Sequence, residues 1–210
     1  MRQNSTLPGK KTIYIIRHGE TEYNRKGIVQ GSGIDSDLNE QGRRQAQKFY
    51  QNYHHVPFDK IYTSSLKRTV QSVEPFLKKE IPHQEIPELN EINWGKFEGV
   101  KGDPSWQKEY YKMIDAWQSG HLHYRIENGE SPLELQHRQK NGLKKILENC
   151  DENTILICMH GRALKSFLCL LLNKPLNRMD DFKHTNLCLY MLEYDGNEFE
   201  LKLENCNKHL

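Results

Sequence analysis

The segment Thr12-Ile-Tyr-Ile-Ile-Arg-His-Gly-Glu-Thr21 joins a short apolar run to a pair of basic side chains. Its first five residues are rich in β-branched side chains, which predicts a buried strand. Arg17 and His18 follow directly, so they stand at the carboxyl end of that strand. A second apolar run, Thr154–Met159, is likewise followed by His160 and a glycine. The sequence therefore predicts two buried strands that each end at a basic site.

The rest of the chain alternates between strand and helix patterns. Further strands are expected at 58–63 and in a C-terminal hairpin, whose strands at 187–194 and 198–204 flank Asp195-Gly-Asn197. Helical spacing of apolar residues predicts helices over 40–53, 105–118 and 162–172. This alternation predicts an α/β fold, a three-layer α/β/α sandwich with a mostly parallel central sheet and an antiparallel C-terminal hairpin. We expect a single domain over residues 1–210 with an irregular start at residues 1–10.

Two further helix starts are predicted from capping residues. Ser64-Ser65 can cap a helix that carries apolar residues on one side, and Pro75 should end or kink that helix early. Ser131-Pro-Leu-Glu134 contains a capping box with proline at the first helical position. This second helix should run to about Cys150.

Basic side chains gather at the carboxyl ends of three predicted strands. Arg17 and His18 follow the first, Arg68 lies just beyond the second on the first turn of a helix, and His160 follows the third. In an open α/β sheet these ends meet at the crevice where such folds bind ligands. We therefore expect two arginines and two histidines to surround one small anion.

Five ordered segments resemble the histidine phosphatase superfamily, which includes the cofactor-dependent phosphoglycerate mutases. They are Arg17–Asn24 (R-H-G-E-T-x-x-N), Gly27–Gly31 followed by Leu38–Gly42, Tyr62–Thr69, Glu91–Gly99, and His160-Gly161. The resemblance covers nearly the whole chain. It implies an enzyme that transfers phosphoryl groups through a phosphohistidine.

The resemblance assigns catalytic roles to five residues. His18 is the nucleophile, and its neutral imidazole needs the other ring nitrogen held, usually by donating to a carbonyl. Arg17 and Arg68 supply forked donors for the phosphoryl oxygens, and a charged His160 completes the clamp. Glu91 protonates the leaving alkoxide and then activates water. Because preorganised cations can neutralise the transferring group, we expect no metal site and no cofactor.

The resemblance also places Asn24, Gln30, Gly31 and Gly161, with Arg17 and Arg68, around the substrate. Asn24 can hydrogen-bond a phosphoryl oxygen. For Gln30, a substrate contact and a plain turn remain equally open.

Substrate specificity is expected from Gln30, Ile34 and residues 100–130, which contain Trp106, Tyr110 and Tyr111. These aromatic residues favour an organic phosphomonoester. Arg162 departs from many relatives, which have a small residue after His-Gly, and it either adds positive charge beside the phosphate or faces solvent.

Hydrolysis is favoured over two alternatives. Phosphoglycerate mutases typically carry arginine after the catalytic glutamate and a long arginine-rich insertion, whereas Ile92 follows Glu91 here and residues 100–130 contain only Arg125. A mutase would also need 2,3-bisphosphoglycerate as cofactor. A non-catalytic protein that binds phospholigands would have lost one of the five catalytic residues, and all five are present.

The composition of the chain indicates which kinds of partner and which cellular compartment to expect. Thirty basic residues face 28 acidic ones, for a net charge of +2, which predicts no nucleic-acid binding. The longest apolar run, Phe167–Leu172, is too short to cross a bilayer, and the polar amino terminus has no signal-type apolar region. Five cysteines, an odd number, favour free thiols in a reducing compartment, so we expect a cytoplasmic protein. The expected partner is a small phosphomonoester substrate, and a homodimer stays open.

Overall fold

The computed structural model describes residues 9–102 and 104–210, and its core is a six-stranded sheet in the order β3-β2-β4-β1-β5-β6. The strands are β1 (Lys11–Arg17), β2 (Lys60–Thr63), β3 (His83–Glu85), β4 (Thr154–Met159), β5 (Leu189–Tyr194) and β6 (Phe199–Cys206). The first four in chain order pair in parallel, and β5 pairs antiparallel with both β1 and β6. The predicted sheet and its C-terminal hairpin are confirmed. The expected irregular start falls largely on residues 1–8, which lie outside the described residues.

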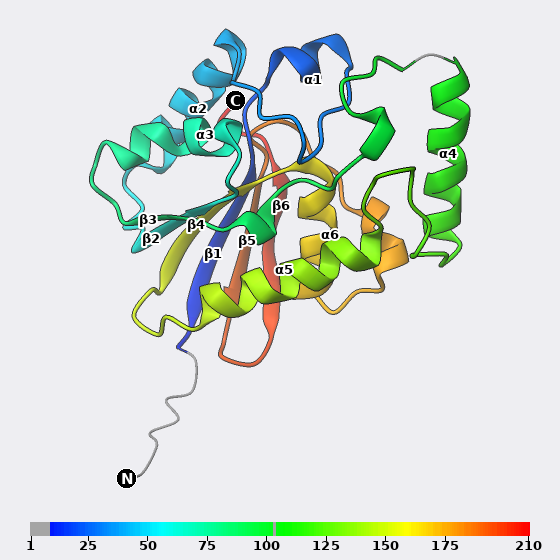
Figure 1. Ribbon diagram of the computed structural model, residues 1–210. Coiled ribbons are helices and arrows are strands. Elements are labelled where there is room, and N and C mark those ends of the chain that lie inside the picture. The colour runs from blue at the N-terminus through cyan, green and yellow to red at the C-terminus, as the bar shows by residue number, and fades with distance from the viewer. Residues whose placement is uncertain (1–8, 103) are drawn as a thin grey trace.

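Side chains along the central strands alternate between two hydrophobic cores. Ile13 and Ile15 of β1 belong to the larger core, whereas Ile16 belongs to the smaller one together with Leu156 and Cys158 of β4. Helices cover both faces, with α2 (Glu40–Tyr53) and α3 (Lys67–Leu77) on one side of the sheet and α5 (Pro132–Leu147) and α6 (Gly161–Leu171) on the other (Figure 1). The three layers explain why the predicted strands are continuous apolar runs rather than alternating ones.

The described helices agree with the predicted ones except where an element is very short. The α-helices are α1 (Glu22–Lys26), α2 (Glu40–Tyr53), α3 (Lys67–Leu77), α4 (Pro104–Gln118), α5 (Pro132–Leu147) and α6 (Gly161–Leu171). Short 3-10 helices lie at η1 (Pro87–Leu89), η2 (Gly95–Phe97) and η3 (Leu176–Asp181). The sequence did not predict α1, β3 or the 3-10 helices, because three to six residues are too few to show a period.

Only one of the two predicted caps forms. The box at Ser131 and Glu134 is present in both directions. The cap at Ser64-Ser65 was wrong: α3 begins after Leu66, which makes no side-chain cap. The hydroxyl of Ser64 turns instead toward His160, as described below. Pro75 lies in the last turn of α3 and does not end it at once.

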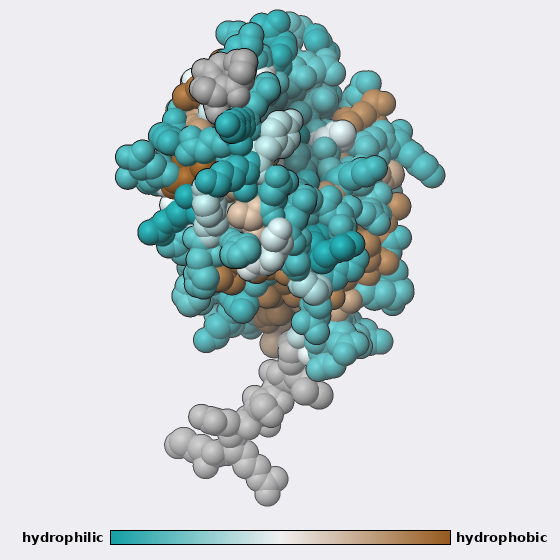
Figure 2. Space-filling view, turned by 90° about the vertical axis from the view of Figure 1, so that its right-hand side faces the viewer, coloured by the Kyte–Doolittle hydropathy of each residue, from teal (hydrophilic) through white to brown (hydrophobic). Residues whose placement is uncertain are grey.

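Hydrophilic residues cover most of the face shown in Figure 2, and apolar residues appear there in scattered patches. Within residues 9–102 and 104–210, no helix is both long and apolar enough to cross a membrane.

Candidate active site

The parallel pairing of β1 with β4 brings the two histidines together. Arg17 is in register with Met159, so the next residues, His18 and His160, leave the sheet side by side with ring centroids 5.2 Å apart. The His18 N–H continues the ladder by donating to the Met159 carbonyl at 2.9 Å. Arg68 reaches the same place from the start of α3. We call Arg17, His18, Arg68 and His160 the phosphate end.

His18 is held as a neutral nucleophile. Its Nδ1 lies 2.7 Å from the Gly19 carbonyl, which can only accept, so Nδ1 carries the proton. Burial, with the charges of Arg17 and Arg68 nearby, lowers the pKa of His18 well below its usual value. The lone pair therefore sits on Nε2. The tautomer expected from the sequence is confirmed.

The loop after β1 owes its position to a close approach of two glycines. A Cβ on Gly19 would lie 2.7 Å from the Gly42 carbonyl oxygen, and one on Gly42 would lie 2.2 Å from the Glu20 oxygen. No other residue type fits either site without moving backbone. The contact fixes the loop that carries His18 against the start of α2.

Arg17 has one donor that nothing in the described structure satisfies. Its Nη1 donates to Nδ1 of His184 at 3.2 Å, whereas its buried Nε has no hydrogen-bond partner among the described residues. Burial, and then the charge of Arg17, lower the pKa of His184 to about 3, so that ring is neutral and accepts the bond. An orphaned cationic N–H beside His18 is suited to a phosphoryl oxygen.

Three acceptors orient the guanidinium of Arg68. Its Nε donates to Nδ1 of His160 at 3.2 Å, Nη1 to the Ile34 carbonyl at 2.6 Å and Nη2 to the Gly31 carbonyl at 3.1 Å. Burial lowers the pKa of Arg68 to about 10, which still leaves a full positive charge at neutral pH. Arg68 is thus a fixed cation whose direction is set before any ligand binds.

His160 does not carry the positive charge that the family resemblance led us to expect. Burial and the neighbouring Arg68 lower the pKa of His160 well below its usual value. Its Nδ1 accepts from Arg68, so Nε2 holds the proton and donates to the Ser64 hydroxyl at 2.7 Å. The expected imidazolium is wrong for this structure. His160 orients Arg68 instead of adding a third cation.

The Glu91 carboxylate is held at the start of α6. Oε1 accepts from the backbone N–H groups of Ile92 and Ala163, at 2.9 and 2.8 Å, and Oε2 accepts from that of Arg162 at 3.0 Å. The last two are among the N–H groups that a helix start leaves without partners. Glu91 also lines the cavity with His18. The predicted acid therefore lies in the same cavity as the predicted nucleophile.

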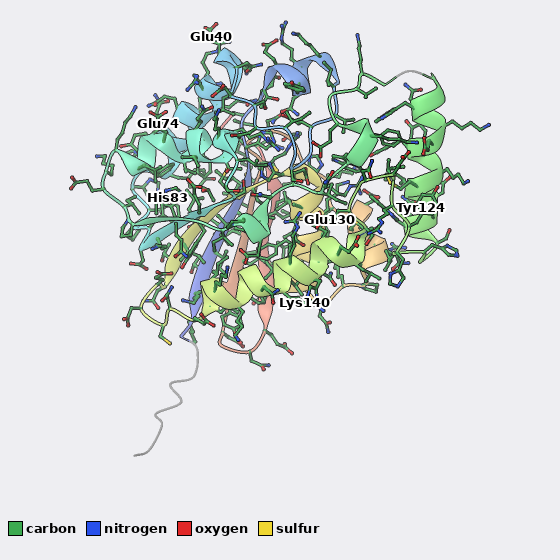
Figure 3. The ribbon with its side chains drawn as sticks, viewed as in Figure 1. Glu40, Glu74, His83, Tyr124, Glu130 and Lys140 are labelled. Carbon is green, nitrogen blue, oxygen red and sulfur yellow. The ribbon has the colours of Figure 1, made fainter. Side chains whose placement is uncertain are left out.

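Arg138 of α5 holds the backbone on which Glu91 sits. Its guanidinium donates to the carbonyls of Glu88, Asn90 and Glu91 at 2.8 to 2.9 Å. A forked pair with both carboxylate oxygens of Glu130, at 2.7 and 2.9 Å, orients it. Figure 3 shows Glu130 beside the N-terminal end of α5. One half-buried arginine thus ties the acid segment to the helix layer.

The cavity above the phosphate end has a volume of about 190 Å³. Trp94, Trp106 and Tyr110 line one side, and we call them the aromatic wall. Ile28 and Val29 also line the cavity. Tyr111, grouped with these aromatic residues by sequence, is 61% exposed and does not line it.

The predicted substrate residues divide into cavity-lining and supporting positions. Asn24 lines the cavity, and its carbonyl oxygen accepts from Thr21 and Asn186, which leaves its amide nitrogen to donate. Gln30 also lines the cavity, but its amide already donates to Thr21 and accepts from Ser36, both at 2.7 Å. That arrangement favours the turn role over a substrate contact.

The two glycines support the arginines. A Cβ on Gly161 would lie 2.7 Å from the His184 ring, and one on Gly31 would lie 2.0 Å from a carboxylate oxygen of Glu98. Gly161 therefore leaves room for the histidine that binds Arg17. Gly31 brings its carbonyl to Arg68.

Four supporting residues escaped the sequence interpretation: His184, Asn186, Arg138 and Ser64. Ser64 was noticed, but as a helix cap. The other three lie outside the five motif segments, and nothing in the local pattern marks them. Their roles appear only when distant elements are packed together.

Comparison with known proteins agrees with this geometry. The sequence profile described as the histidine phosphatase superfamily (branch 1) matches residues 13–207. The adenosylcobalamin/alpha-ribazole phosphatase of Escherichia coli is 27% identical over 92% of this chain and 95% of its own length. A probable phosphoglycerate mutase, GpmB of Erwinia tasmaniensis, is 31% identical over 79% of this chain and 76% of its own. The solved structure of Bacillus stearothermophilus YhfR superimposes with a TM-score of 0.85 at 29% identity, covering 95% of this chain and 98% of that one.

Proposed function

The chain belongs to the histidine phosphatase superfamily, and we propose that it is a phosphomonoester hydrolase that acts through a phosphohistidine at His18. The observation that carries the proposal is the neutral His18 ring, with its lone pair on Nε2, in the same cavity as Arg17, whose Nε has no partner among the described residues. A phosphoryl group held by Arg17 and Arg68 would meet that nitrogen. The phosphatase relatives support the same chemistry.

In the first step, the Nε2 lone pair of His18 attacks phosphorus and the ester P–O bond breaks. The electron pair of that bond leaves with the ester oxygen, which takes a proton from Glu91. Oε1 of Glu91 already accepts two N–H bonds, whereas Oε2 accepts one. Each carboxylate oxygen can accept two hydrogen bonds. Both positions on Oε1 are occupied, so we place the proton that is transferred on Oε2.

In the second step, Glu91 takes a proton from water and the water oxygen attacks the phosphorus of phosphohistidine. The P–N bond breaks, its electron pair returns to Nε2, and inorganic phosphate leaves. Arg17 and Arg68 stabilise the charge on the phosphoryl oxygens in both steps, because they are oriented before the reaction. We propose that they do so without a metal ion or another cofactor.

The proposed setting is the cytoplasm, with a small organic phosphomonoester as the partner and no nucleic acid. The free thiols of Cys158, Cys169 and Cys188, all buried, support a reducing compartment. A polar surface with nearly balanced charge supports a small-molecule substrate over a polyanion.

The test is to trap the intermediate by rapid quench with a phosphate-labelled ester. We expect label on His18 that is lost in acid and kept in base, and none in His18→Ala. His121→Ala, which alters an exposed histidine, is the control and should keep the label. Acid-stable label, or label retained in His18→Ala, would overturn the proposed mechanism.

Phosphoglycerate mutase activity is the second candidate, favoured by the similarity to GpmB. A mutase must grip the substrate carboxylate, but Arg17 is the single cationic side chain among the residues described as lining the cavity. Arg125 pairs with Glu134 at the surface instead. We expect steady phosphate release from 4-nitrophenyl phosphate and little interconversion of 2- and 3-phosphoglycerate, even with 2,3-bisphosphoglycerate present. Efficient interconversion with negligible phosphate release would reverse the choice.

A further inference from the structure

The aromatic wall supplies three of the side chains that line the cavity. Trp106 and Tyr110, one helical turn apart on α4, are stacked with centroids 5.0 Å apart and planes at 8°. The ring of Trp94 lies 5.8 Å from that of Tyr110. Stacked and tilted rings of this kind favour a further ring at a similar spacing.

Arg162 holds this wall in place. Its guanidinium lies 5.8 Å from the Trp94 centroid and 5.5 Å from that of Trp117, and it donates to the Tyr110 hydroxyl at 3.3 Å. Asp180 balances its charge through an ion pair of 2.7 Å. Neither role foreseen from sequence applies, because this arginine is buried and its charge is already paired.

Backbone pairing fixes an apolar part of the cavity lining, at Ile28 and Val29. The Val29 N–H donates to the Val100 carbonyl at 3.2 Å, and the Gly99 N–H donates to the Val29 carbonyl at 2.9 Å. Ile28 and Val29 therefore form an apolar surface held to residues 99–100, which lie between Trp94 and Trp106 in the chain. A flat group bound in the cavity would contact these apolar side chains as well as the aromatic wall.

The charges in the cavity argue against a substrate with a carboxylate. Arg17 is the cation that lines it among the described residues, and its free donor is at the phosphate end. Near the wall, Arg162 and Lys165 both contact the carboxylate of Asp180, and neither is among the described residues that line the cavity. A carboxylate on the leaving group would lose its hydration without gaining a cation.

The cavity is small. An apolar cavity of about 150 Å³ holds one benzene ring, and drug-sized ligands occupy roughly 300–1,000 Å³. At about 190 Å³, this one has room for a phosphoryl group and a single ring. We propose, on the basis of the proposed hydrolase activity, that the aromatic wall is a leaving-group subsite for one flat, uncharged ring. The preferred substrates are then phosphomonoesters of small aromatic alcohols, and phosphoserine and phosphoglycerates are poor ones.

The experiment compares 2-phenylethyl phosphate with ethyl phosphate. The two alkoxide leaving groups are similar in basicity, so the ratio of their kcat/KM values measures the contribution of the ring. We expect the phenyl ester to be favoured by about 10- to 100-fold, the gain expected from burying one apolar ring. Phosphoserine and 3-phosphoglycerate should be slower than the phenyl ester.

Variants then locate the effect in the wall. Tyr110→Leu and Trp106→Leu should each lower the phenyl-to-ethyl ratio toward one, whereas Tyr110→Phe keeps the ring and should keep the ratio. Tyr111→Leu is the matched control, because Tyr111 is on the same helix but exposed, and its ratio should equal that of the unaltered protein. Turnover of ethyl phosphate reports that each variant is folded and active.

The outcomes separate this inference from the proposed function. A phenyl-to-ethyl ratio near one, better turnover of phosphoserine, or equal turnover of 2-cyclohexylethyl phosphate would overturn the flat-ring subsite while hydrolysis stands. An unchanged ratio in both leucine variants would also overturn it. Failure to hydrolyse any ester, together with no label on His18, would instead remove the hydrolase activity itself.

Discussion

Arg17 and His18 of the phosphate end line the same cavity as the aromatic wall, but different forces hold the two regions. Arg17, His18 and Arg68 come from strand ends and a helix start, and each has a hydrogen bond that sets its direction. The aromatic wall comes from α4 and the turn before η2, and ring contacts hold it. The first region depends on direction and charge, the second on shape.

This difference predicts how each region responds to change. Removing a partner at the phosphate end leaves a buried charge or donor without compensation, which is costly wherever it occurs. Replacing a ring in the aromatic wall alters packing and the shape of the cavity but leaves no unpaired charge. We expect the phosphate end to determine the reaction and the aromatic wall to select the substrate.

The largest effect is expected from Arg68→Ala. Loss of one preorganised donor should lower kcat by about 10²–10³-fold or more on every ester, because the phosphoryl group is common to all of them. Arg68→Lys keeps a charge but not the three-way fork, so it should recover only part of the rate. A loss confined to esters with a ring would contradict the expectation that the phosphate end determines the reaction and the aromatic wall selects the substrate. Thermal unfolding of each variant checks that it is folded.

A smaller, selective effect is expected from Arg138→Gln. Without this guanidinium the backbone that carries Glu91 loses its hydrogen bonds at three carbonyls, and misplaced catalytic groups can cost up to about 10²-fold. We expect kcat/KM to fall about 10- to 100-fold for alkyl esters and less for aryl esters, whose leaving oxygen needs less protonation. Glu91→Gln should show the same pattern more strongly.

Arg125→Gln is the matched control for Arg138. It removes an arginine that pairs with Glu134 at the surface, so both ester types should react at the normal rate. Equal losses on alkyl and aryl esters in Arg138→Gln would show that Arg138 serves only stability. They would also show that the segment carrying Glu91 does not affect protonation of the leaving oxygen.

Lowering the pH should destabilise the fold through the buried histidines at and near the phosphate end, and should not act on the aromatic wall. Burial lowers the pKa values of His18, His160 and His184 below the unfolded value of about 6.5. Below that pH the unfolded chain binds more protons than the folded one, so the free energy of unfolding should fall as pH falls. Each histidine contributes up to about 1.4 kcal/mol per pH unit.

Urea unfolding between pH 7.5 and pH 5, in steps of roughly half a unit, measures this slope. His184→Gln should reduce it by up to one proton, and His121→Gln should leave it unchanged, since His121 is exposed. A free energy of unfolding that stays constant through this range would contradict the buried, neutral histidines.

The smallest effect is expected from removing metal ions. Saturating EDTA should leave kcat on 4-nitrophenyl phosphate unchanged within error, because Arg17 and Arg68 already supply the positive charge. A strict requirement for Mg²⁺ would contradict the assignment of that role to the two arginines. In that case a bound metal ion, and not the two arginines alone, would neutralise the phosphoryl group.

The residues that could be predicted from sequence are those with a local signature. Arg17, His18 and His160 directly follow apolar, β-branched runs, so their place at the carboxyl ends of neighbouring strands follows from the strand pattern alone. Glu91 was different. No strand or helix predicted from the sequence adjoins Glu91, and only the resemblance to the histidine phosphatase superfamily identified it as the candidate acid.

The supporting residues had no such signature. His184 lies 167 positions from the Arg17 that it binds, and Arg138 lies 47 positions from Glu91. The charge of His160 was misjudged for the same reason: a histidine after a strand gives no information about the Arg68 and Ser64 that surround it. Contacts across such separations depend on how helices pack on the sheet.

The sequence by itself determined the α/β class, the longer strands and helices, and the histidine at the end of β1, because each rests on periodicity or on neighbours in the chain. Only the tertiary structure decided which proton each histidine holds, what orients Arg68, and which aromatic side chains line the cavity. Protonation depends on burial and on nearby charge, and Tyr110 and Tyr111 differ by one position along a helix. That one position turns a side chain by about 100°, from the cavity to solvent.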